Sequence, residues 1–101
     1  MDKILNNLGL CNRARGLITG EEFVCDGMAN KTVKYVFLAS DASANAKKKI
    51  YNKANYYNVV LDNSFTSEEI SKAIGKNNRM VVGITDIGFA KKIKEIRWFY
   101  G

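Results

Sequence analysis

The sequence predicts an α/β fold, a three-layer α/β/α sandwich around a mixed sheet of about four strands. Two observations carry this prediction. Apolar residues recur every three or four positions in some segments and form short unbroken runs in others. The two kinds of segment alternate along the whole chain, which is typical of helices packed on both faces of one sheet. At 101 residues, the chain is expected to form a single domain, residues 1–101.

The first elements are a helix, a short strand and a second helix. Residues 3–13 carry apolar side chains at helical spacing, which predicts the first helix. The triplet at 17–19 predicts a short strand. Gly20 then opens the second helix, and Glu21 and Glu22 fall in its first turn, where the helix dipole favours carboxylates.

The middle of the chain predicts a buried strand and a third helix. Residues 33–39, VKYVFLA, are apolar except for one lysine, as expected of a strand covered on both faces. An apolar residue every three or four positions over 46–57 predicts the helix. Three side chains that precede this helix can cap its start: Ser40, Asp41 and Ser43.

The last third predicts a strand, a helix, a strand and a helix. Residues 59–61 predict a short strand. Thr66 and Glu69 have capping-box spacing, which predicts a helix start. The run MVVGIT at 80–85 predicts another buried strand, and Asp86 is expected to cap the final helix. In that helix, Phe89, Ile93, Ile96 and Tyr100 are expected to form one apolar stripe.

Composition narrows the possible functions. Sixteen Lys and Arg against ten Asp and Glu give a net charge of +6. The basic excess is equal in the two halves, which predicts a folded basic surface able to attract nucleic acid. The absence of His excludes His-based zinc sites and triads. Cys11 and Cys25 are expected to be buried thiols. Without a signal-peptide pattern or an apolar run long enough to span a membrane, we expect a cytoplasmic protein that makes no membrane contact.

No residue pattern predicts an enzyme, a cofactor or a metal. The carboxylate pairs at 21–22 and 68–69 lie at helix starts, where the helix dipole accounts for them, and no phosphate-binding glycine loop is present. The lysines at 47–49 are expected to form a solvated face. At least two of the aromatic side chains at 98–100 are expected to pack onto the sheet. Asp41 leaves a second possibility open: it follows a strand end, where α/β sheets place active residues, and would suit a phosphoacceptor switch.

Three segments together resemble a known family. They are LGLCNRARGLITGEE, VKYVFLASDASANAKKKI and ISKAIGKNNRMVVGITDIGFAKKI. Their order and spacing, from about residue 4 to residue 94, are similar to those of the bacterial YlxQ-like branch of a ribosomal-protein superfamily. That superfamily is named for the large-subunit proteins L-seven-Ae and L-thirty-e. The resemblance implies an α/β/α sandwich, in agreement with the predicted helices and strands.

The resemblance also implies recognition of kink-turns, which are sharply bent internal loops in RNA. Family members contact such loops with the start of the second helix and with the loop before the last strand. A ribosome-associated or regulatory RNA–protein complex is the implied setting, and a monomer is expected. The implied RNA-binding residues are Gly20, Glu21, Glu22, Phe23, Lys34, Lys76, Asn77, Asn78, Arg79, Met80 and Val81.

The second helix departs from the pattern Gly-x-Asn-Glu-x-x-Lys of archaeal members. Aligned on the glycine, Glu22 stands at the Asn position, Phe23 at the Glu position and Asp26 at the Lys position. Glu22 can accept a hydrogen bond from a guanine edge, Phe23 can only stack, and Asp26 repels phosphate. We therefore expect weaker binding, or a different RNA preference, than in archaeal relatives. The alternative is that the same fold docks a protein partner through Phe23 and the aromatic C-terminus.

Overall fold

The computed structural model describes residues 2–100, and the side chain of Tyr100 lies outside the described part. Helices and strands alternate along this range. The elements are α1 (Lys3–Arg13), β1 (Leu17–Thr19), α2 (Glu21–Ala29), β2 (Tyr35–Leu38), α3 (Ala44–Tyr56), β3 (Val60–Asp62), α4 (Ser67–Ala73), β4 (Val81–Ile84) and α5 (Ile87–Tyr100).

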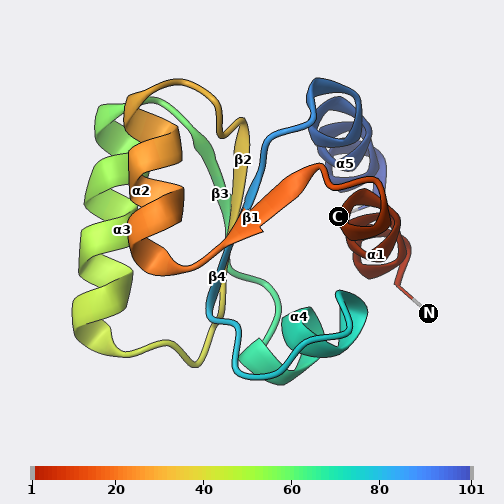
Figure 1. The fold of residues 1–101 in the computed structure, drawn as a ribbon, viewed down its shortest axis with the longest axis horizontal. Helices are drawn as coiled ribbons and strands as arrows, with labels where there is room; N and C mark the ends of the chain where they lie inside the picture. Colours follow the sequence, from red (N-terminus) through yellow and green to blue (C-terminus); the bar gives the residue numbers. More distant parts are fainter. Residues whose placement is uncertain (1, 101) are drawn as a thin grey trace.

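The strands form one mixed sheet with helices on both faces. Their order is β1-β4-β2-β3; β2 pairs in parallel with β3, while β4 is antiparallel to both of its neighbours. In Figure 1 the sheet is seen nearly edge-on, with α2 and α3 on its left and α1, α4 and α5 on its right. This arrangement confirms the predicted three-layer α/β/α sandwich.

The core lies between the layers, around the two central strands. All four residues of β2 and of β4 are buried. Helices on both faces contribute fully buried side chains to it, among them Leu8, Val24, Met28, Ile50, Ile70 and Ile93. Cys11 and Cys25 are free thiols inside this core, as predicted. No helix in residues 2–100 is long and apolar enough to cross a membrane.

Side chains cap most helix starts as the sequence predicted. Thr66 and Glu69 form the reciprocal capping box of α4. The Asp86 carboxylate accepts a hydrogen bond from the Phe89 N–H at 2.9 Å, and Ser43 caps α3. Each such cap is worth about 1 kcal/mol of helix stability.

Asp41 forms hydrogen bonds with α4, not with α3, the helix that directly follows it in the sequence. Its two carboxylate oxygens accept from the backbone N–H and the hydroxyl of Ser67, both at 2.7 Å. These hydrogen bonds lower the pKa of Asp41. Because Ser67 opens α4, Asp41 joins the end of β2 to that helix. A carboxylate engaged at both oxygens does not favour the phosphoacceptor interpretation.

Strand bounds differ from the predicted ones by one or two residues. β2 and β4 are shorter than the apolar runs at 33–39 and 80–85. Val33 and Ala39, at the two ends of the first run, are buried although they lie outside β2, and burial alone does not distinguish them from strand residues. Val59 lies outside β3 because its N–H donates to the Ala54 carbonyl in the turn that ends α3.

The prediction for the C-terminal aromatic residues is wrong. Trp98 and Phe99 are 85% and 76% exposed, so at most one of the three side chains can face the sheet. Ile93 is fully buried and Ile96 partly buried, which confirms these positions of the predicted stripe on α5. At 100° per residue, neither Trp98 nor Phe99 lies on that stripe. The Tyr100 side chain, the last member of the stripe, lies outside the described residues.

Close packing under α2 makes Gly27 indispensable. A Cβ built on Gly27 would lie 2.3 Å from Cγ2 of the buried Val33 and 3.3 Å from Cδ1 of Ile18. We expect Gly27→Ala to lower the free energy of unfolding by about 1–3 kcal/mol, because the buried neighbours must shift. Chemical denaturation measures the change. Gly88→Ala is the control, since a Cβ there meets nothing closer than 3.2 Å; equal stability of the two variants would contradict the prediction.

Candidate nucleic-acid interface

The start of α2 is open to a ligand. Gly20 has a φ of 105°, which favours glycine, and no side chain caps the helix. The Gly20 N–H donates to the Val81 carbonyl at 3.1 Å. Within residues 2–100, the N–H groups of Glu21, Glu22 and Phe23 have no protein acceptor. Three free N–H groups and the positive end of the helix dipole can bind a phosphate.

The loop before β4 is held firmly by its backbone. Ser71, which is buried, is the anchor: its hydroxyl accepts from the Arg79 N–H at 2.8 Å and its carbonyl from the Lys76 N–H at 2.9 Å. The Met80 carbonyl accepts from the Ala39 N–H at 2.8 Å. The turn uses left-handed backbone at Asn78, with a φ of 53°. These hydrogen bonds fix the loop backbone, and the side chains of Lys76, Asn77, Asn78 and Met80 are exposed to solvent, while Arg79 is half-buried.

A shallow hollow of about 370 Å³ joins these two segments. We call it the interface hollow. Its lining residues are Gly20, Glu21, Ala42, Ser43, Ala46, Asn78, Arg79, Met80 and Val81. The structure thus brings together several of the predicted residues and, through the Gly20–Val81 hydrogen bond, the two chain segments that contain them.

The start of α3 is the part of the hollow that sequence reasoning missed. Ala42, Ser43 and Ala46 line it beside Gly20. β1 and β2 both pair antiparallel with β4, so they run in the same direction and their carboxyl ends meet where β4 begins. The strand order would have placed these residues in the site, but no local signal in residues 40–46 does so.

Arg79 carries an uncompensated positive charge in this hollow. Its Nε–H is buried and has no hydrogen-bond acceptor in the described part of the chain, and neither of the ion pairs found there involves Arg79. A buried donor without an acceptor is costly. Because the guanidinium also forms no ion pair within residues 2–100, its charge remains available to an incoming phosphate or base edge. The neighbouring Met80 is 40% exposed and adds an apolar contact.

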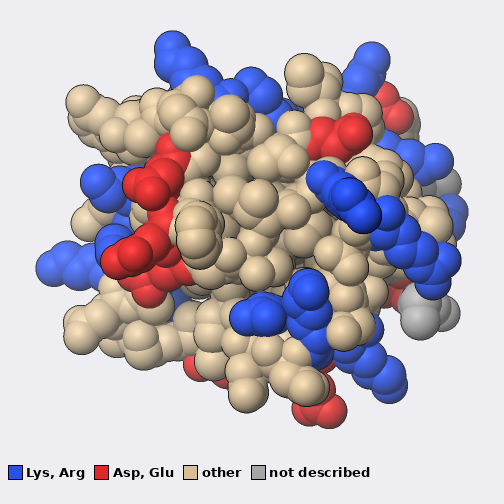
Figure 2. All heavy atoms as spheres, viewed as in Figure 1, with Lys and Arg blue, Asp and Glu red and all other residues tan. Residues whose placement is uncertain are grey.

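The remaining predicted residues give the two sides of the hollow opposite charge. Phe23 is 70% exposed on α2. Glu22 and Asp26 are also exposed, and Figure 2 shows acidic side chains gathered over α2. Lys76 and Asn77 line an adjacent hollow toward α4. The surface is therefore acidic along α2 and basic along the loop before β4.

Lys48 and Lys49 of the run at 47–49 are exposed, in agreement with the predicted solvated face. Lys49 forms an ion pair with Glu21, with Nζ and Oε1 3.3 Å apart. This hydrogen bond raises the pKa of Lys49. The pair joins α3 to the first turn of α2 and compensates one of the two carboxylates at the open helix start.

Lys34 lies away from the interface hollow. It precedes Tyr35, which pairs with Ile84 at the far end of β4, whereas Val81 begins β4 beside the hollow. The resemblance implied that Lys34 acts together with the other predicted residues, but the antiparallel pairing of β2 with β4 separates it from them.

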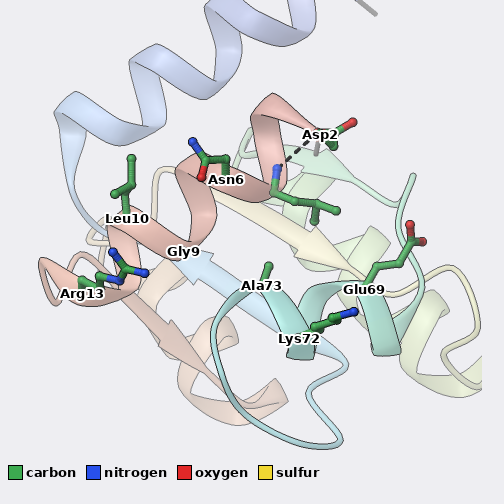
Figure 3. A pocket seen from close by; sticks show the side chains of 9 residues that line it. Asp2, Asn6, Gly9, Leu10, Arg13, Glu69, Lys72 and Ala73 are labelled. Atoms are coloured by element: carbon green, nitrogen blue, oxygen red, sulfur yellow. Dashed lines mark hydrogen bonds between the residues drawn. The ribbon is translucent and has the colours of Figure 1, made fainter.

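A larger hollow, of about 550 Å³, lies on the opposite layer between α1 and α4. Figure 3 shows its lining residues on α1, among them Gly9, Leu10 and Arg13, and on α4, among them Lys72 and Ala73. Its lining contains both Asp and Glu as well as Arg and Lys. This mixed charge distinguishes it from an anion site.

The sequence of this chain matches a profile of the ribosomal protein L7Ae/L30e/S12e/Gadd45 family over residues 2–94. The chain belongs to this family. RNA-binding protein YlxQ of Enterococcus faecium is 49% identical over 94 residues, covering 93% of this chain and 90% of the relative. RNA-binding protein YlxQ of Bacillus subtilis (strain 168) is 43% identical over 86 residues, covering 85% and 86%. These family members confirm the YlxQ-like resemblance.

Solved structures of similar proteins share the architecture. A protein of unknown function from Bacillus halodurans C superposes with a TM-score of 0.91 at 38% identity, covering 95% of this chain and 97% of that one. The Giardia lamblia 15.5kD RNA binding protein superposes with a TM-score of 0.78 at 12% identity, covering 95% and 86%, which shows the common fold alone.

The family members do not point to catalysis. The two YlxQ relatives are named as RNA-binding proteins, not as enzymes. Within this chain, burial and the nearby Asp86 raise the pKa of the Cys11 thiol to about 11. At neutral pH a thiol with that pKa is protonated, so Cys11 acts as a core residue rather than a nucleophile.

Proposed function

We propose that this protein binds structured RNA and recognises kink-turn-like bends through the interface hollow. One observation carries the proposal: the hollow places the uncapped start of α2 opposite Arg79, whose charge has no partner among residues 2–100. Family membership and the names of the YlxQ relatives support RNA as the ligand. The hollow is formed by one chain, so a monomer is sufficient.

Each part of the hollow suits a different group of a bent RNA. The free N–H groups of α2 suit a phosphate. Arg79 suits a phosphate or a guanine edge, because its guanidinium can donate two parallel hydrogen bonds. Met80, which is 40% exposed, suits the face of an extruded base, and bases in bent or unpaired RNA are accessible to such contacts. Val81 is 3% exposed and supports this part of the hollow from beneath. Asp26 stands where the archaeal pattern has a lysine, so a positive charge is missing there. We therefore expect a lower RNA affinity than that of archaeal relatives.

The direct test is a titration with three labelled RNAs: a kink-turn, its unbent duplex counterpart and a simple stem–loop. Each is measured at two salt concentrations. We expect the kink-turn to bind most tightly and all affinities to fall as salt rises, because phosphate contacts release counterions. Equal, weak binding to the three RNAs would reject kink-turn recognition. Binding that depends on salt but is equally tight for all three RNAs would support general RNA binding without kink-turn recognition.

We expect Phe23→Ala to weaken kink-turn binding by about 1–3 kcal/mol, the usual contribution of one base stacked on an aromatic side chain. The free energy of unfolding should change by less than about 0.5 kcal/mol, because Phe23 is exposed. Fluorescence anisotropy and denaturation measure the two effects. Tyr56→Ala is the matched control: Tyr56 is 79% exposed but ends α3, whereas Phe23 lies in the first turn of α2, next to Gly20 and Glu21 of the interface hollow. Unchanged RNA affinity would instead favour protein docking as the role of Phe23.

The setting of this RNA binding is also part of the proposal. We expect the RNA target in a ribosome-associated or regulatory RNA–protein complex. Trp98 and Phe99 belong to the layer of α1, α4 and α5, whereas Phe23 belongs to the layer of α2 and α3. They do not form one protein-docking surface, so the alternative that combines them loses support.

A further inference from the structure

A second basic surface lies at the far end of the sheet from the interface hollow. Two adjoining hollows, of about 370 Å³ and 320 Å³, share Lys34 and Lys94 in their linings. The first also includes Lys31 and the second Lys91. We call these four residues the lysine surface.

Strand pairing assembles this surface from two distant parts of the chain. The Lys34 N–H donates to the Ile84 carbonyl at 2.7 Å, which ties the start of β2 to the end of β4. The turn after α2 and the start of α5 therefore meet at one end of the sheet. Figure 2 shows basic side chains along the upper edge of the molecule, above these segments in Figure 1.

The lysine surface is electrostatically uncompensated. Neither hollow has an Asp or Glu in its lining, and no ion pair to these four lysines is present in residues 2–100. Asp86 and Glu95 are the nearest carboxylates along α5; Asp86 is engaged with the Phe89 N–H. Glu95 is one turn from Lys91, but the two side chains form no ion pair in the described part of α5. Four like charges around two hollows repel one another unless an anion binds among them.

The hollows provide a surface against which an anion can be seated. Lys34 is half-buried, and its Nζ donates to the Lys31 carbonyl at 2.7 Å. Met28, Val33 and Val59 line the first hollow, and Ala90 lines the second. The other three ammonium groups belong to exposed residues around this apolar base. Lysine presents a point charge rather than the planar fork of arginine, so it suits phosphates rather than base edges.

We infer that the lysine surface binds the phosphate backbone of a second RNA segment, independently of sequence, while the interface hollow holds the bend. This inference rests on the proposed function. β2 and β4, four residues each and roughly 13 Å long, separate the two surfaces in a molecule of 30 × 25 × 25 Å. One protein would therefore hold two duplex segments at opposite ends of its sheet.

The test is a two-step binding experiment with the full chain. One equivalent of unlabelled kink-turn RNA is bound first, and a labelled plain RNA duplex is then titrated in. Two variants are compared with the wild type: Lys91→Gln/Lys94→Gln in the lysine surface and Lys48→Gln/Lys53→Gln on α3. All four lysines are exposed helix residues, Lys48 and Lys53 line neither hollow, and both variants remove two charges.

We expect the wild type and the α3 variant to capture the duplex at physiological salt with a Kd on the order of 10⁻⁴ to 10⁻⁶ M, and more tightly at lower salt. The Lys91→Gln/Lys94→Gln variant should bind it on the order of tenfold more weakly, and its plot of log K against log salt should be shallower by about 2. Its affinity for the kink-turn should not change. Lys31→Gln/Lys34→Gln should reproduce the effect from the other segment.

Two results would overturn the inference: no duplex captured by the wild type, or equal capture by the wild type and both charge variants. Binding to vesicles containing phosphatidylserine, without binding to duplex RNA, would assign the surface to a membrane and also overturn it. Failure of the proposed function is distinguishable. The first step alone then shows no kink-turn preference, and duplex binding to the free protein variants still decides the role of the lysine surface.

Discussion

Reversing the charge of Arg79 (Arg79→Glu) should weaken kink-turn binding by about 1–3 kcal/mol, roughly 5- to 150-fold. The variant removes a cation whose Nε–H has no acceptor in the described part of the protein and places a carboxylate near incoming phosphates. The backbone bonds of Arg79 to Ser71 do not depend on the side chain, so the loop should keep its shape. Fluorescence anisotropy at two salt concentrations measures the loss.

The control for Arg79 is Arg13→Glu, which changes the net charge equally. Arg13 is exposed at the end of α1, on the layer opposite α2. If only net charge matters, both variants should lose the same RNA affinity, and both losses should become smaller as the salt concentration rises. An Arg79→Glu variant with wild-type affinity would show that the RNA contacts lie elsewhere. Arg79→Lys separates charge from geometry, since lysine cannot donate the bidentate pair.

A buried carboxylate makes the largest single contribution to stability that we expect from a polar group. Asp62 is 7% exposed at the end of β3. Its carboxylate accepts from the Tyr35 hydroxyl at 2.9 Å, from Nε of Arg97 at 3.0 Å and from the Ser64 N–H at 3.0 Å. Arg97 also lies over the Phe65 ring, with 5.6 Å to its centroid. Asp62 thus anchors α5 to the sheet.

Asp62→Ala should lower the free energy of unfolding by about 3 kcal/mol, the lower end for breaking a buried ion pair, because the partner Arg97 is partly exposed. The loss arises because the buried Tyr35 hydroxyl and the partly buried Arg97 guanidinium lose their shared acceptor. Urea denaturation at neutral pH measures it. Asp26→Ala, at an exposed position of α2, should be near neutral. Equal stability of the two variants would contradict the anchoring role.

The contribution of Asp62 should depend on pH in a defined direction. Burial alone would raise the pKa of Asp62, but hydrogen bonds from Ser64, Arg97 and Tyr35 outweigh it and lower the pKa. A group whose pKa is lower in the folded state stabilises the fold above its unfolded pKa of about 4. That stabilisation is lost as the pH falls from there through the folded pKa. The stability difference between wild type and Asp62→Ala should therefore shrink below about pH 4.

Local patterns predicted most of the fold because they depend on neighbours in sequence. The capping box of Thr66 and Glu69 and the cap at Asp86 require partners only three residues away. The buried runs that became β2 and β4 follow from hydrophobicity alone. Asp41 shows the limit of such inference. The prediction that it caps the helix directly after it is wrong, because Ser43 caps α3 and Asp41 binds Ser67, 26 residues away. The exposed aromatic residues of α5 show it as well, because aromatic character does not specify which face of a helix meets the sheet.

The sequence by itself determined the alternation of helices and strands, the family and the two segments of the candidate RNA site. The alternation depends on side-chain spacing within short segments, while the family and the two site segments follow from the resemblance that three segments carry from about residue 4 to residue 94. Only the tertiary structure decided the strand order, which separates Lys34 from the interface hollow and groups it with Lys91 and Lys94. It also decided that Phe23 is exposed and that Arg79 lacks a partner among the described residues. Charge and exposure at a site depend on which distant elements pack beside it, and that information becomes available only when the sheet has formed.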